Sequence, residues 1–276
     1  MPQTLQSVAP AALGVYAGFM AGTKHPGQRL AKVIARSGIE SRRGAERIIA
    51  EGRVTVNGEA VFSPATNVCE TDRITLDGKP LPGIEPPRLW RYHKPTGLVT
   101  TRRDEKGRMT VFDNLPPALP RVMSIGRLDL TSEGLLLLTN DGGLKRFIEH
   151  PATGWIRRYR VRAFGRVEES RLERLRKGMV REGSQFGPMQ IEIDSRKGHN
   201  SWLTVGLRQG RNREVRRAME AIGLTVNRLI RVSFGPFQLG DLPPGRVREV
   251  RRRVLRDQVG QLEQFQEQPQ RLSGVE

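Results

Sequence analysis

The stretch SIGRLDLTSEGLLLLTNDGG, residues 124–143, joins a charged turn to a wholly apolar run. Arg127 and Asp129 stand two residues apart, ahead of the turn-forming sequence Thr-Ser-Glu-Gly and four consecutive leucines. A carboxylate beside a buried strand costs several kcal/mol unless a cation or hydrogen bonds compensate it. The stretch therefore predicts a carboxylate that is presented on a turn and held by arginines. The alternative is a structural Arg–Asp pair that closes a hairpin.

The net charge of the chain indicates a polyanionic partner. Its 276 residues include 47 lysines and arginines against 29 aspartates and glutamates, which gives a net charge of +18. Because such cations displace counterions from phosphates, nucleic acid is the expected partner, and an anionic membrane surface is the weaker alternative. Aromatic residues make up only 5% of the chain, so base stacking is not expected to be the main means of binding.

Metal and disulfide chemistry are not indicated. Cys69 is the single cysteine, and the four histidines are scattered without the spacing of a zinc site. We therefore expect no metal and no cofactor, and we expect Cys69 to be a small core residue. A lone cysteine without a secretory signal fits the reducing cytoplasm. Residues 9–20 are mildly apolar but too short to span a bilayer, so no membrane association is expected.

Residues 28–82 predict a small unit of two helices and a sheet. Residues 28–36 have the apolar spacing of a short amphipathic helix, and Ser41 is positioned to cap a second helix. Residues 53–61 alternate around Asn57-Gly58, which predicts a tight hairpin. The arginines of this unit are concentrated on its two helices.

The pattern RLAK…GIESRRGAERII…GRVTVNG resembles the small RNA-binding domain first described in ribosomal protein S-four. The resemblance implies that five basic side chains face RNA phosphates: Lys32, Arg36, Arg42, Arg43 and Arg53. The alternative is that they form an ordinary solvated face. Residues 83–87 contain prolines and predict a stiff linker to the next domain.

Three later stretches carry further candidate residues. In residues 89–101, two strands are expected around a Pro-Thr-Gly turn, where Lys94 is either a phosphate contact or a plain turn lysine. Residues 155–163 alternate apolar and basic side chains, which places Tyr159 on the same side of a strand as Val161. The sequence QGRNREVRRAM, residues 209–219, predicts a helix that buries Val215 and has arginines on its other faces. Such a helix start invites an anion.

Taken in order, GRLDLTSEGLLLLTNDG, RYRV, QGRNREVRR and RLIRV resemble the motifs of the RsuA/RluB family of pseudouridine synthases. The resemblance covers roughly residues 28–256 and implies an α+β chain. The expected organisation is a disordered leader (1–27), the S-four-like RNA-binding domain (28–82), a linker (83–87), a catalytic domain (88–256) with a mixed, mainly antiparallel sheet flanked by helices, and a frayed helix and tail (257–276).

The resemblance also implies a role for each motif residue. Asp129 matches the catalytic aspartate, Arg127 the arginine that helps to displace the target base, Tyr159 the tyrosine that stacks on the uracil, Leu229 the apolar residue that packs under the base, and Arg216 the arginine that pairs with the aspartate, for which Arg213 is the second choice. The implied activity is isomerisation of a uridine in ribosomal RNA by a cytoplasmic monomer, with 23S RNA of the large subunit favoured. The alternatives are a small-subunit synthase and a non-catalytic ribosome-assembly factor.

Overall fold

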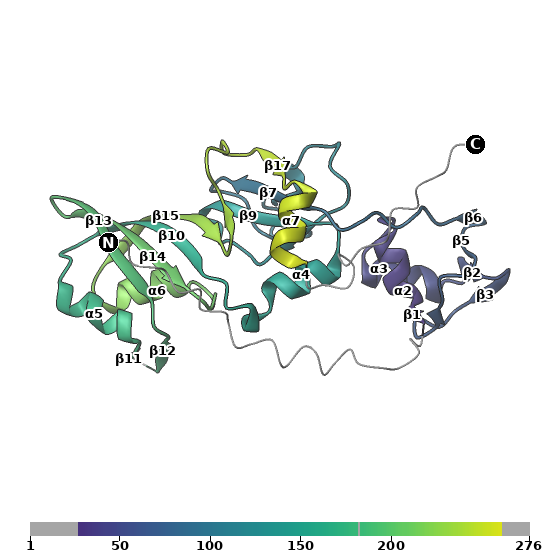
Figure 1. The fold of residues 1–276 in the computed structure, drawn as a ribbon, viewed down its shortest axis with the longest axis horizontal. Coiled ribbons are helices and arrows are strands. Elements are labelled where there is room, and N and C mark those ends of the chain that lie inside the picture. Colours follow the sequence, from purple (N-terminus) through teal and green to yellow (C-terminus); the bar gives the residue numbers. More distant parts are fainter. Residues whose placement is uncertain (1–26, 182, 261–276) are drawn as a thin grey trace, which may run out of the picture. The chain divides into compact units, whose positions relative to one another are not determined.

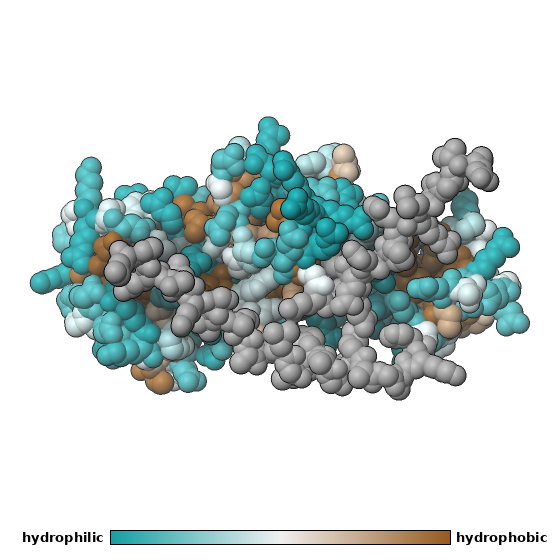
Figure 2. All heavy atoms as spheres, in the orientation of Figure 1, coloured by the Kyte–Doolittle hydropathy of each residue, from teal (hydrophilic) through white to brown (hydrophobic). Residues whose placement is uncertain are grey.

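The computed structural model describes residues 27–181 and 183–260, which divide into two compact units between Glu85 and Pro86 (Figure 1). The predicted leader, apart from Gly27, and residues 261–276 of the predicted tail lie outside the described residues. Figure 2 shows hydrophilic side chains over most of the visible described surface, with hydrophobic ones in separate spots. The two units are described one at a time.

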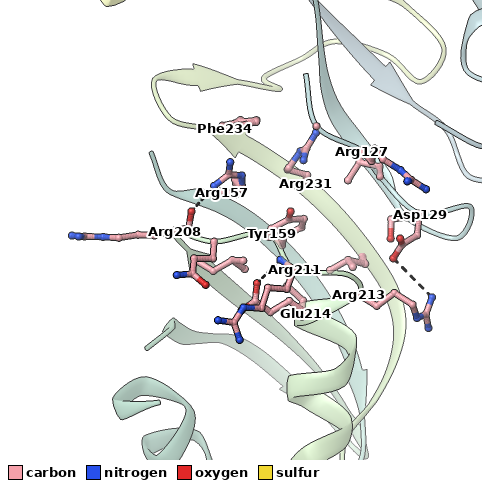
Figure 3. A pocket seen from close by; sticks show the side chains of 18 of the residues that line it. Arg127, Asp129, Arg157, Tyr159, Arg208, Arg211, Arg213, Glu214, Arg231 and Phe234 are labelled. Carbon is pink, nitrogen blue, oxygen red and sulfur yellow. Dashed lines mark hydrogen bonds and ion pairs between the residues drawn. The ribbon is translucent and has the colours of Figure 1, made fainter. Parts of the chain in front are cut away.

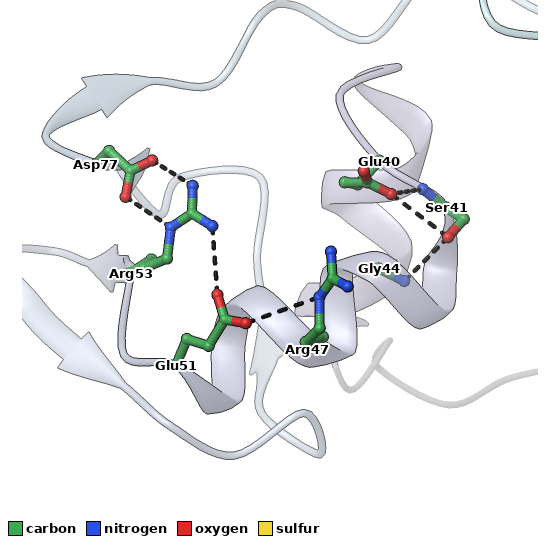
Figure 4. Close-up of polar contacts among 7 residues, drawn as sticks. All are labelled: Glu40, Ser41, Gly44, Arg47, Glu51, Arg53 and Asp77. Atoms are coloured by element: carbon green, nitrogen blue, oxygen red, sulfur yellow. Dashed lines mark hydrogen bonds and ion pairs between the residues drawn. The ribbon is translucent and has the colours of Figure 1, made fainter.

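The first unit packs two helices against short antiparallel strands. Its core consists of apolar side chains from both helices, among them Leu30, Ile34 and Ile49, packed with Val54. Ser41 caps the second helix, because its hydroxyl accepts a hydrogen bond from the Gly44 amide at 2.9 Å (Figure 4). The elements are β1 (Gln28–Arg29), α2 (Leu30–Arg36), α3 (Arg42–Ala50), β2 (Val54–Val56), β3 (Glu59–Val61), β4 (Asn67–Val68), β5 (Ile74–Leu76) and β6 (Lys79–Pro80).

The predicted hairpin of this unit is confirmed, and one prediction for its core is wrong. Asn57 and Gly58 join β2 to β3 with φ of 54° and 91°, the left-handed backbone that such a two-residue turn requires. Cys69, expected in the core, is exposed. The neighbouring Val68 takes the buried position, because successive side chains of an extended segment point to opposite sides.

A nine-stranded sheet forms the centre of the second unit. Its strand order is β13-β14-β10-β15-β9-β7-β17, with β8 paired to β9 and β16 paired to β15. Neighbouring strands are antiparallel except β15 and β9, which are parallel, so the sheet is mixed and mainly antiparallel. The strands are β7 (Leu89–Lys94), β8 (Met123–Ile125), β9 (Glu133–Thr139), β10 (Arg157–Phe164), β13 (Gln190–Lys197), β14 (Asn200–Leu207), β15 (Thr225–Phe234), β16 (Phe237–Gln238) and β17 (Val247–Glu249).

Helices pack on both faces of the sheet around β9, which explains the four-leucine run. Leu136 and Leu138 of β9 belong to the larger core, which includes α5 and α6. Leu135 and Leu137 point the other way, into a second core that includes α4 and α7. Because β9 is buried on both faces, its sequence shows no polar alternation. The helices are α4 (Gly142–Glu149), α5 (Glu169–Lys177), α6 (Glu214–Ala221) and α7 (Arg252–Val259), with single 3₁₀ turns at η1 (Phe112–Asn114) and η2 (Pro151–Thr153).

Three local predictions for this unit differ from the structure. Residues 98–101 do not form the expected strand, since Val99 makes only an isolated bridge to Thr110. A hairpin of β11 (Met179–Arg181) and β12 (Ser184–Phe186) follows α5, where no strands were predicted. The C-terminal helix α7 begins before residue 257 and is anchored by buried Leu255 and Val259 rather than frayed.

Candidate active site

A pocket of about 550 Å³ lies beside the turn that precedes β9 (Figure 3). Five of the six residues predicted for the catalytic unit line it: Arg127, Asp129, Tyr159, Arg213 and Leu229. They come from four separate parts of the chain, so the pocket exists only in the folded unit. The sixth predicted residue, Arg216, is buried next to the pocket rather than in its lining.

The order of the strands explains why these residues meet. On β10, Tyr159 lies opposite Arg231 of β15, and Val161 lies opposite Leu229. On the other side of β15, Arg231 lies beside Gly134 at the start of β9. The turn that carries Asp129 leads directly into β9. Three adjacent strands therefore bring the carboxylate, the tyrosine ring and the leucine side chain to one place.

Gly134 allows β9 and β15 to approach closely. Its φ is +105°, and a Cβ atom built there would lie 2.4 Å from the carbonyl oxygen of Arg231. Any other residue would therefore require the strand backbones to shift. The glycine of the Thr-Ser-Glu-Gly sequence is thus required by the packing of the sheet.

A buried lysine holds the turn of Asp129. The Lys94 side chain is fully buried, and its Nζ donates to the carbonyls of Asp129 at 3.1 Å, Ser132 at 2.8 Å and Pro95 at 3.0 Å. Burial lowers the pKa of Lys94 to about 8, partly opposed by the negative charges of Asp129 and Glu133. Lys94 is therefore not an RNA phosphate contact, one of its two predicted roles, but holds the main chain of the turn that carries Asp129.

Two further contacts fix the start of the same turn. The Thr100 hydroxyl donates to the Leu128 carbonyl at 2.8 Å and accepts from the Leu128 amide at 3.2 Å. The Gly126 amide donates to Glu149 Oε1 at 2.6 Å, and Lys145 also binds this carboxylate. Main-chain atoms on both sides of Asp129 are thus fixed while its own carboxylate faces the pocket.

Arg213, and not Arg216, makes the ion pair with Asp129 (Figure 3). Arg213 Nη1 lies 3.9 Å from Asp129 Oδ2, with 45% and 33% of the two side chains exposed. Arg213 sits just before α6 with a φ of 49°, which is unusual for a residue with a side chain. The structure therefore favours the second of the two predicted arginines as the direct partner.

Arg216 has a different position from the predicted one because α6 begins at Glu214 and turns Arg216 toward the sheet. Its Nη1 donates to the Val226 carbonyl at 2.9 Å, and its Nη2 donates to the Thr131 carbonyl at 3.1 Å. Burial, and then the charge of Arg213, lower the pKa of Arg216, while Asp129 opposes this. Arg216 thus holds the far end of the turn that carries Asp129, as Lys94 holds its centre.

The pocket also contains cationic and aromatic residues that were not predicted. The Arg157 guanidinium lies 4.3 Å from the ring centre of Phe234, and that of Arg231 lies 5.4 Å from it. Arg231 is buried, and its Nε donates to the Leu135 carbonyl at 2.7 Å. A signal for both arginines was present, because Arg157 shares the strand parity of Tyr159 and Arg231 that of Leu229.

The described residues give no indication of a metal centre. No group of three or more His, Cys, Asp or Glu residues in residues 27–181 and 183–260 is arranged to hold a metal ion. Over the same ranges, no helix has the length and apolar character to span a membrane. The pocket instead combines three carboxylates, those of Asp129, Glu149 and Glu214, with one tyrosine, an apolar wall and several guanidinium groups, which suits a polyanion carrying a planar base.

Comparison with known proteins assigns both units. Residues 28–74 match the S4 domain, and residues 88–221 match the RNA pseudouridylate synthase family. An uncharacterized RNA pseudouridine synthase of Rickettsia felis is 46% identical over 228 residues, which cover 83% of this chain and 99% of the relative. The chain belongs to the RNA pseudouridine synthase family.

Further relatives of this RNA pseudouridine synthase agree. A ribosomal large subunit pseudouridine synthase B of Pseudomonas aeruginosa is 43% identical over 245 residues, which cover 85% of this chain and 63% of that protein. A crystal structure of a pseudouridylate synthase superposes with a TM-score of 0.60 at 28% identity, covering 84% of this chain and all of that one. The similarity to both therefore extends over the greater part of this synthase.

The basic residues of the S4 domain differ in whether ion pairs or hydrogen bonds within the protein engage their side chains. Lys32 and Arg43 are exposed without an ion pair or side-chain hydrogen bond in the described chain, and Arg42 is exposed with Glu46 at 3.7 Å. Arg36 is half-buried and lies 3.4 Å from the Gln28 side chain.

Arg53 is more strongly engaged than the other basic residues of the S4 domain. It binds Asp77 through two hydrogen bonds of 3.0 and 2.7 Å and Glu51 at 3.3 Å (Figure 4). This pairing raises the pKa of Arg53 and lowers that of Asp77. The structure thus shows Arg53 paired with two carboxylates at the surface, and its predicted contact with RNA phosphates stays a prediction.

Proposed function

We propose that this synthase isomerises a uridine of 23S ribosomal RNA, with Asp129 as the reactive carboxylate. The observation that carries the proposal is the shared pocket of Asp129, Tyr159 and Leu229, in which the carboxylate remains one-third exposed. The choice of the large subunit is supported by the relative from Pseudomonas aeruginosa, whose name states that substrate. We also propose that the enzyme acts as a cytoplasmic monomer, since neither unit requires a second copy to complete the pocket.

The reaction breaks the bond from the ribose to ring nitrogen 1 of uracil and forms one to ring carbon 5. It involves no net oxidation and no net hydrolysis. A carboxylate can serve either as the nucleophile on the sugar or as the base that removes a sugar proton. The carboxylate of Asp129 at the pocket wall, with Arg213 balancing its charge, fits both routes. The other two carboxylates of the lining, Glu149 and Glu214, accept hydrogen bonds from the main-chain amides of Gly126 and Arg211.

The remaining lining residues suit a nucleotide that has left its helix. Removing a base from the stack costs a few kcal/mol, which pocket contacts must offset. Tyr159 and Leu229 provide flat and apolar surface for the uracil, and the pocket volume lies within the range of small-ligand sites. Arg127 is exposed beside Asp129 and has no ion-pair partner in the described chain, so we propose that it contacts RNA in place of the displaced base.

The test is Asp129→Asn in a strain whose own copy of the gene is deleted. Carbodiimide modification followed by primer extension would locate pseudouridines throughout 23S and 16S RNA. We expect one stop in 23S RNA to disappear. Asp241→Asn is the matched control, because Asp241 is 81% exposed and lies away from the pocket lining. If no stop that the parent gene produces is lost in the Asp129→Asn strain, the catalytic role is refuted. If the lost stop lies in 16S RNA, the choice of subunit is refuted.

A further inference from the structure

Four adjacent antiparallel strands, β13, β14, β10 and β15, have one face that no described helix covers. Helices α5 and α6 pack on the opposite face, with the side chains of Tyr159, Val161 and Leu203, and lie below these strands in Figure 1. The second core, with α4 and α7, reaches these strands only at Ile230 and Phe234 of β15. We call the uncovered side, defined by Arg158, Arg160, Arg162, Phe164, Trp202 and Arg228, the open face.

The alternation of β10 puts a row of arginines on the open face. Tyr159, Val161 and Ala163 are buried, whereas the side chains between them, of Arg158, Arg160 and Arg162, are exposed. Residues two apart on a strand are separated by roughly 6.5 Å, so the three guanidinium groups form a continuous line. The sheet register adds Arg228 of β15 directly beside Arg162.

Much of this charge is not neutralised by the protein. Arg228 binds Glu133, and Arg160 lies 3.8 Å from Asp194. Arg158 and Arg162, in contrast, have no ion pair or side-chain hydrogen bond with any residue in the described ranges. Arg228, directly opposite Arg162, has its charge balanced by Glu133, so the unbalanced charge of the open face is that of Arg158 and Arg162. The open face is therefore suited to a bound polyanion.

Aromatic rings lie among these arginines. Trp202 is the cross-strand neighbour of Arg162, and its ring lies 4.8 Å below the Arg160 guanidinium. Phe164, at the end of the same arginine row, is 48% exposed, and its ring centre lies 5.8 Å from that of His199. Double-stranded RNA is bound mainly through phosphates and 2′-hydroxyls, whereas unpaired bases stack on aromatic rings and guanidinium planes of a four-stranded sheet.

We propose that the open face binds a single-stranded segment of RNA separate from the target uridine. It lies on the other side of the sheet from Tyr159, so a base stacked on Phe164 is not the one in the pocket. Phosphates of this segment contact Arg158 and Arg162, and its bases stack near Phe164 and Trp202. The substrate RNA would therefore contain an unpaired segment in addition to the stem or loop that presents the uridine.

The test measures binding of the full chain to a fluorescein-labelled oligoadenylate of about ten nucleotides, a length suited to a site of this kind. This probe has no uridine, so its binding is independent of isomerisation and of the role of Asp129. For Arg158→Gln/Arg162→Gln, we expect the plot of log affinity against log salt to become shallower by about 1.4, or about 0.7 per lost phosphate contact. For Phe164→Ala, we expect at least fivefold weaker binding with an unchanged slope.

Arg246→Gln/Arg253→Gln is the matched control. It removes the same charge from two exposed arginines outside the open face. Equal losses in the control and in Arg158→Gln/Arg162→Gln would overturn the proposal. An equally large effect on an RNA duplex of the same length would also overturn it, because the site would not select single strands. Phenylglyoxal modification of the unaltered protein gives a second readout: bound oligoadenylate should protect Arg158 and Arg162, and full reactivity of both would contradict the proposal.

Discussion

A buried ammonium group supports the turn that carries Asp129, the proposed reactive carboxylate. Lys94 can use all three of its donors on main-chain carbonyls, two of which belong to Asp129 and Ser132. Replacement by methionine keeps the apolar stem but leaves these carbonyls without their donor. Buried groups in that condition cost about 1–3 kcal/mol each, so the turn should loosen before the sheet does.

We expect Lys94→Met to lower kcat more than it raises KM, since the RNA contacts are elsewhere.

The substitution Lys94→Met should also change how the free energy of unfolding depends on pH. The Lys94 pKa falls from its ordinary 10.5 to about 8 on folding, so between these pH values the unfolded chain holds the extra proton. Stability of the parent protein should therefore rise relative to Lys94→Met from pH 8 to pH 10.5, by up to about 3 kcal/mol. Urea unfolding of both proteins at a series of pH values measures this difference. A difference that is independent of pH would contradict it.

Arg213 combines an unusual backbone with a functional contact. Left-handed backbone costs a residue with a side chain roughly 1–2 kcal/mol, and such strain often occurs at functional sites. Arg213→Gly should therefore melt no lower than the parent protein, and higher than Arg213→Ala, while both variants lose the ion pair to Asp129. We expect both to have reduced kcat. Calorimetry with single-turnover assays would measure the two effects, and an Arg213→Gly variant with full activity would show that the ion pair is dispensable.

At the scale of the element, α3 presents Arg42 and Arg43 on its first turn, where the helix dipole adds a partial positive charge. We expect Arg42→Gln/Arg43→Gln to weaken binding to ribosomal RNA and to reduce the salt slope by about 1.4–1.8, or about 0.7–0.9 per lost phosphate contact.

The S4 domain supplies its own control. Arg47→Gln/Arg53→Gln removes the same charge from two arginines already paired with Glu51 and Asp77. Filter binding over a range of salt concentrations should give a smaller change in slope for this variant. Equal changes for the two double variants would mean that the unit attracts RNA through its overall charge alone.

At the scale of the whole molecule, the sequence predicts the individual helices and strands better than it predicts which of them lie side by side. Strand parity correctly placed Tyr159 on the same side of its strand as Val161, whereas Leu229 was predicted only from the family resemblance. The cap at Ser41 and the turn at Asn57-Gly58 are local signals. The arginine that reaches Asp129 depends on where α6 begins and on the pairing of β15 with β9, and neither follows from local spacing. The same is true of Lys94, whose partners lie 35 and 38 residues away in the chain.

The close approach at Gly134 has a consequence for variation in this protein. Among many random single substitutions, those at position 134 should be nearly absent from functional survivors, whichever amino acid is introduced. At exposed positions outside the pocket and the open face, by contrast, many replacements should leave an active enzyme. A position with no room for any side chain tolerates fewer substitutions than a position that needs a particular chemical group. The spacing between Asp129 and Tyr159 therefore depends on Gly134, a residue that has no side chain to contribute to the pocket.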